Sequence, residues 1–107
     1  MFGLKEKNAR IIAFADQLLL DLAERFPVEK EAQLGTNRLK PARQLGRAAN
    51  ELEQGVVTFQ GEQRLGIYGK AKLLNRVKWG LKERGYSEAF IDDTIAELTR
   101  FLNIRAK

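Results

Sequence analysis

The chain has 107 residues, a length typical of one domain, and its 44% hydrophobic and 31% charged residues indicate a globular protein. It contains neither histidine nor cysteine, which excludes disulfides, thiolate nucleophiles, the usual transition-metal ligand sets and any side chain whose ordinary pKa lies near neutrality. The net charge of +5 favours polyanionic partners, such as nucleic acid.

The first helical pattern covers residues 4–26. Its apolar residues recur at steps of three and four and predict one buried stripe: Ile11, Ala15, Leu18, Leu22 and Phe26. Pro27 disfavours helical geometry at Phe26 and predicts the end of this helix. Phe14, Leu19 and Leu20 lie beside the stripe and widen the apolar surface.

The second helix is predicted at 41–60, with Pro41 in its first turn, where the missing N–H of proline costs nothing. Its apolar rhythm continues past Gly55 to Phe59. Two interpretations compete there. The helix either ends at Gly55, with a short extended piece after it, or runs through to about Gln60. The unbroken rhythm favours the continuous helix, because packing can offset the cost of about 1 kcal/mol for a helical glycine.

The third helix is predicted at 67–84 and the fourth at 87–103. The stripe expected for the third is Ile67, Ala71, Leu74, Val77 and Leu81, and that for the fourth is Ile91, Ile95, Leu98 and Leu102. Gly85 is expected to terminate the third helix in a left-handed conformation, and Ser87 to cap the N-terminus of the fourth.

Four amphipathic helices with little strand pattern predict an all-α fold, a small single-domain bundle over 1–107 with short connections. The longest polar gap lies between the first two helices, at 28–40, and we expect it to be the most mobile loop.

One face of the third helix is a candidate binding surface. Its residues recur at i, i+4, i+7, i+8 and i+11: Tyr68, Lys72, Asn75, Arg76 and Trp79. Aromatic rings beside cations can stack on bases while the cations meet phosphates, and the same residue types dominate protein interfaces. The alternative is a central helix that buries both aromatic rings, with Lys72 and Arg76 reaching past them to water.

A second candidate is the set of cations around the start of the second helix: Arg38, Lys40, Arg43 and Arg47. If they converge with the cations of the third helix (Lys70, Lys72, Arg76, Lys78 and Lys82), they form a surface that tracks phosphates. The alternative is a solvated helix face, partly neutralised by an Arg47–Glu51 pair.

Catalysis is not expected. Asp92 and Asp93 are adjacent on a helix and point about 100° apart, and their position near a helix N-terminus explains them as partners of the helix dipole. Ser87, the only serine, has no histidine to activate it. We therefore expect no metal site, no cofactor and no enzymatic activity.

Residues 81–98 contain the sequence Arg-Gly-Tyr-Ser followed by an Ile-x-x-x-Ile-x-x-Leu stripe. This segment resembles the helix junction of the RecX family of recombinase regulators. The resemblance implies a helical-repeat protein that acts on recombinase filaments on DNA. No second repeat is present in the chain, and no functional residue is carried over from the family.

The sequence thus predicts a small basic helical module that binds nucleic acid, or a nucleoprotein complex, in a non-specific and salt-dependent manner. The alternative is a module for protein–protein interaction or homo-oligomerisation, based on the apolar surface at Phe14, Leu19 and Leu20. No run of about 20 apolar residues and no secretory cleavage site is present, so we expect a cytoplasmic protein without membrane contact.

Overall fold

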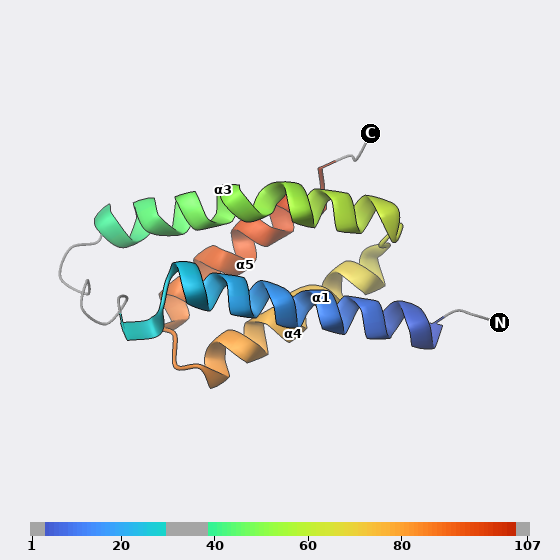
Figure 1. Cartoon of the computed structure of the whole chain (residues 1–107), viewed down its shortest axis with the longest axis horizontal. Coiled ribbons are helices and arrows are strands. Elements are labelled where there is room, and N and C mark those ends of the chain that lie inside the picture. The colour runs from blue at the N-terminus through green and yellow to red at the C-terminus, as the bar shows by residue number, and fades with distance from the viewer. Residues whose placement is uncertain (1–3, 30–38, 105–107) are drawn as a thin grey trace.

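Four helices make up the described part of the chain. The computed structural model describes residues 4–29 and 39–104, and the side chains of 5–29 and 50–104. The helices are α1 (Leu4–Arg25), α3 (Leu39–Glu62), α4 (Ile67–Glu83) and α5 (Glu88–Leu102), and no strand occurs within these ranges (Figure 1). The all-α prediction is confirmed. The expected mobile loop lies mainly at 30–38, outside the described residues.

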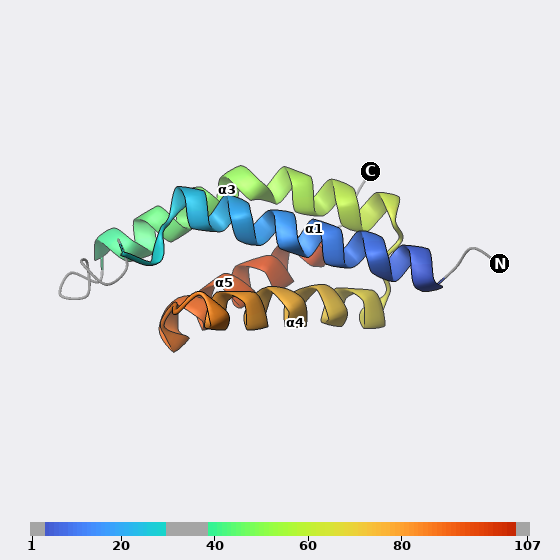
Figure 2. The ribbon, with the colours of Figure 1, turned by 60° about the horizontal axis from the view of Figure 1, so that its bottom comes forward.

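The helices form two antiparallel pairs, α1 with α3 and α4 with α5, as Figures 1 and 2 show. The main packing contacts join α1 to α4, α3 to α5 and α4 to α5. Contact between α1 and α3 is sparser. There the Phe14 and Phe59 rings stack with centroids 4.0 Å apart, and Arg25 forms an ion pair with Glu51. The helix α4 therefore lies between α1 and α5 and has one free side.

The stripe predicted for the first helix is confirmed, because all five of its members are buried: Ile11, Ala15, Leu18, Leu22 and Phe26. The helix α3 also runs through Gly55, as the apolar rhythm favoured. It extends the interval predicted for the second helix by two residues at each end, and Val56 is fully buried within it.

The stripe predicted for the third helix is wrong in its first half. Ile67 is 89% exposed, Ala71 is exposed and Leu74 is only partly buried. The buried stripe of α4 is Gly69, Leu73, Val77 and Leu81. The core-facing side is therefore rotated by roughly a quarter of a turn from the prediction, at 100° per residue.

Glycine is the physical reason for this rotation. An apolar pattern cannot detect a buried residue that has no side chain, yet Gly69 and Gly80 both lie close to side chains of the core. A Cβ atom built on Gly80 would lie 2.3 Å from Cδ1 of Leu19, so α1 and α4 are in close contact at this point.

The junction between α4 and α5 follows the prediction. Gly85 has φ +92°, the left-handed region in which glycine is favoured, and the Ser87 hydroxyl accepts a hydrogen bond from the Phe90 N–H at 3.1 Å. The Tyr86 hydroxyl donates a buried hydrogen bond of 2.6 Å to the carbonyl of Phe26, at the end of α1. The turn thus fastens the C-terminal end of α1 to the start of α5.

The stripe of α5 is largely as predicted. Ile91, Leu98 and Leu102 are buried, while Ile95 is only partly buried. The predicted stripe omitted Thr94, which is also buried. Its hydroxyl donates to the Phe90 carbonyl at 2.8 Å, so the burial leaves no polar hydrogen unpaired.

Candidate functional site

The free side of α4 carries two exposed aromatic residues. Tyr68 is 72% exposed and Trp79 is 54% exposed, and the alternative of a helix that buries both rings is therefore wrong. Eleven residues make three turns with a remainder of about 20°, so the two side chains are aligned, about 16 Å apart along the helix axis. They lie opposite the buried Leu73 and Val77.

Cations surround these rings. The helix α4 contains five basic residues and one acidic residue, Glu83. The ammonium nitrogen of Lys82 lies 5.2 Å from the centre of the Trp79 ring, within the range of a cation–π contact. We call the residues on the free side of this helix the α4 face: Tyr68, Lys72, Asn75, Lys78, Trp79 and Lys82.

Arg76 is separate from this set. Its guanidinium donates two hydrogen bonds to the carboxylate of Asp16 on α1, at 3.1 and 3.4 Å. The hydrogen bond and the negative charge of Asp16 both raise the pKa of Arg76 above its ordinary value. The side chain predicted to meet phosphate therefore holds α1 against α4, and its charge is locally balanced.

The side chains of the cations predicted around the start of the second helix lie outside the described set. Arg38 lies outside the described residues, and Lys40, Arg43 and Arg47 lie on the α3 backbone with side chains outside the described set. In Figure 2, α1 and α5 lie between α3 and α4. The helices α3 and α4, which carry the two sets of predicted cations, are thus not direct neighbours in this view. The convergence of the two sets stays a prediction.

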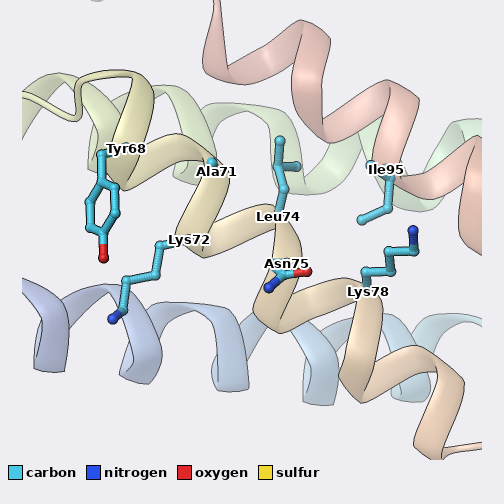
Figure 3. Close-up of a pocket in the computed structure, with 7 residues that line it drawn as sticks. All are labelled: Tyr68, Ala71, Lys72, Leu74, Asn75, Lys78 and Ile95. Atoms are coloured by element: carbon cyan, nitrogen blue, oxygen red, sulfur yellow. The ribbon is translucent and has the colours of Figure 1, made fainter.

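A groove of about 620 Å³ runs beside the α4 face, between α4 and α5. It is lined by Tyr68, Ala71, Lys72, Leu74, Asn75, Lys78 and Ile95 (Figure 3). Figure 3 shows Tyr68 and Lys72 extending side by side, while Leu74 extends toward α5 and Ile95 extends toward α4. Apolar carbons thus form one part of the groove, and two ammonium groups and an amide form the other.

Sequence analysis missed the roles of Leu74 and Ile95. Both were expected in the core, because a three–four apolar rhythm does not distinguish the centre of a buried stripe from its edge. One signal in the sequence pointed to an apolar residue outside the core. Leu73 and Leu74 are adjacent, and a single buried stripe of a helix cannot be centred on both of them.

The apolar surface expected on the first helix is largely absent. Leu19 is buried against α4, Phe14 is partly buried in its stack with Phe59, and only Leu20 is prominently exposed, at 53%. A single exposed leucine is ordinary on a protein surface. The patch predicted from Phe14, Leu19 and Leu20 is therefore corrected to one residue.

Other features do not form a site. Within residues 4–29 and 39–104, no cluster of three or more acidic side chains is placed to hold a metal ion. Among the described helices, none has the length and apolar content of a membrane span.

Comparisons of the chain with protein-family models, curated proteins and solved structures found no match. The resemblance of residues 81–98 to the RecX junction therefore gains no support from them.

Proposed function

We propose that the protein is a non-catalytic binding module whose α4 face contacts nucleic acid without sequence specificity. The observation that carries the proposal is the exposure of Tyr68 and Trp79 on one line of a helix that also bears lysines. Large aromatic rings are usually buried, whereas proteins that bind nucleic acid expose them beside cations because rings stack on bases and cations attract phosphates.

The charges of the α4 face support this proposal. Lys72, Lys78 and Lys82 share the face, and none of them forms an ion pair with a carboxylate among the side chains that the structure describes. Each phosphate that a lysine neutralises releases a counterion, which contributes about 0.7–0.9 to the slope of log K against log salt. Three lysines therefore predict a slope of about −2 to −3.

A salt titration tests the proposal. Binding of a fluorescent oligonucleotide would be followed by anisotropy over a range of salt concentrations for the wild-type chain, Lys72→Gln and Lys78→Gln. Each variant is expected to bind more weakly and to reduce the steepness of the slope by about 0.7–0.9. Absence of binding at low salt, or binding that does not depend on salt, contradicts the proposal.

Lys70→Gln is the matched control. It removes the same charge from the same helix, but the Lys70 ammonium points toward α5 and lies 3.4 Å from Oδ1 of Asn103. Its slope should stay near that of the wild type. If Lys70→Gln and Lys72→Gln weaken binding equally, then the net charge of the protein is responsible and the α4 face is not the binding surface.

The module for protein interaction or self-assembly stays a prediction. Its original basis, the apolar surface of the first helix, is reduced to Leu20. Sedimentation of the purified chain distinguishes self-assembly from interaction with another protein, because a strictly monomeric protein excludes self-assembly.

A further inference from the structure

The groove between α4 and α5 has a composition that the electrostatic proposal does not explain. Phosphate contacts require cations on a surface, but they do not require apolar carbon beside those cations. Leu74 and Ile95 are partly buried hydrophobic residues, and together with Ala71 they form the apolar part of the groove lining. The groove has a volume of about 620 Å³ and is open to solvent, so it can receive a flat group without enclosing it.

We infer that this groove holds an unpaired base of a single-stranded nucleic acid, an inference that rests on the proposed function. A base has two apolar faces and a polar edge. Leu74 and Ile95 offer carbon to the faces, and the exposed amide of Asn75, which both donates and accepts, can pair with the edge.

The lysines on the rim of the groove fit the backbone on either side of such a base. Lys72 and Lys78 both line the groove and are six residues apart, about 9 Å along the axis of α4 and about 120° around it. A strand that leaves one base in the groove passes a phosphate on each side of it. The two ammonium groups therefore lie where the strand enters and leaves.

A duplex would use this surface poorly. Its base faces are stacked on one another, so neither the groove nor the rings of Tyr68 and Trp79 can contact them without opening the helix. A single strand presents those faces freely. The exposed aromatic residues and the apolar groove thus favour the same form of nucleic acid.

The pocket on the other flank of α4 is a poorer site for the same ligand. It has a volume of about 310 Å³, and in its lining the carboxylates of Asp16 and Glu83 offset the cations of Arg76 and Arg84, whereas the groove beside α5 carries lysines without a carboxylate. The Asp16 carboxylate is already paired with Arg76, and Glu83 brings a negative charge that repels phosphate. The charge distribution therefore selects the side of α4 that faces α5.

The test compares a single strand of about 12 nucleotides, of mixed sequence, with the blunt duplex that it forms with its complement. Ala71→Leu fills the groove without changing the charge. Stacking on an aromatic side chain contributes about five- to 150-fold per base, and Tyr68 lines the groove. A variant that keeps the base out of the groove should therefore weaken single-strand binding about tenfold and leave the salt slope unchanged. Ala13→Leu makes the same change at an exposed position of α1 that does not line the groove, and it should have no effect.

A methyl resonance of Ile95 gives a direct readout. It should shift when the single strand is added and stay unchanged with the duplex, because a base in the groove places its ring current over this side chain. Unfolding by urea checks that Ala71→Leu is folded.

Three results overturn the inference. If the duplex binds as tightly as the single strand or more tightly, the inference is contradicted while the proposed function stands. The same holds if Ala71→Leu and Ala13→Leu lose equal affinity for the single strand. If neither the single strand nor the duplex shows salt-dependent binding, both the proposed function and the inference are contradicted.

Discussion

The close contact between α1 and α4 at Gly80 leads to the sharpest prediction of stability. Gly80 is part of the helix α4, next to Trp79, and its missing side chain allows Leu19 to approach. A methyl group at position 80 would lie 2.3 Å from Cδ1 and 2.8 Å from Cδ2 of Leu19, closer than carbon atoms can approach. Leu19 is buried in the core cluster, so moving its side chain away from position 80 costs packing contacts there. Gly80→Ala should therefore destabilise the fold.

Two opposing effects set the size of the change. Overpacking a buried site costs about 1–3 kcal/mol, while replacing glycine with alanine inside a helix gains up to about 1 kcal/mol. The overpacking dominates, because both methyls and Cγ of Leu19 lie within 3.1 Å of the new atom. We expect the free energy of unfolding to fall by about 1 kcal/mol, a loss of about 4–8 °C in Tm.

Gly55→Ala separates the two effects. Gly55 also lies inside a helix, but nothing lies within 4 Å of a Cβ built on it. This variant should raise the free energy of unfolding by up to about 1 kcal/mol. The gain from helix propensity is shared, so the two variants should differ by about 1–3 kcal/mol, the cost of overpacking alone.

Urea unfolding followed by far-ultraviolet circular dichroism measures both variants. A double-mutant cycle then identifies the cause: in a Leu19→Ala background the atoms that clash are gone, so Gly80→Ala should become neutral or stabilising. Equal stabilisation by Gly80→Ala and Gly55→Ala would refute the reasoning, since α1 would not approach α4 as the structure places it.

Three further predictions concern the junction and the α4 face. Gly85→Ala should lower the free energy of unfolding by about 1–2 kcal/mol, because φ of +92° is strained for a residue with a Cβ; an unchanged urea midpoint would contradict this. Ser87→Ala should cost about 1 kcal/mol, because the Phe90 N–H loses its acceptor, whereas Ser87→Asp keeps the cap and should cost less. Trp79, the sole tryptophan, is 54% exposed, so its fluorescence should be red-shifted and readily quenched by acrylamide; a blue, protected emission would place the ring in the core.

Apolar spacing and helix-end residues predicted much of this fold. All four helix intervals agree with the observed bounds within two residues. The stripe of the first helix is buried in full. Gly85 and Ser87 mark the α4–α5 junction in the conformations expected of them. These features depend on the local backbone, so a single sequence contains the information that determines them.

The orientation of α4 depends on non-local packing, and there the prediction failed. Ile67, Ala71 and Leu74 have the spacing of a buried stripe, as do Gly69, Leu73 and Val77. Hydrophobicity favours the first set, since glycine adds nothing to an apolar pattern. Shape favours the second set, because a helix that presents glycines can approach its neighbour closely. Only the position of α1 determines which effect dominates, and the local pattern of the third helix does not contain that information.

The same packing determines where the candidate site lies. The spacing of eleven residues predicted that Tyr68 and Trp79 share a face, but it did not predict whether that face meets solvent. Once Gly69 and Gly80 turn toward the core, the opposite side of the helix, with both aromatic residues, must face outward. That rotation also moves Leu74 from the predicted stripe to the rim of the core, where it lines the groove. A variant that forces Leu19 away from Gly80 is therefore expected to change both the stability of the bundle and the environment of Trp79. The two effects should appear together because they have one structural cause.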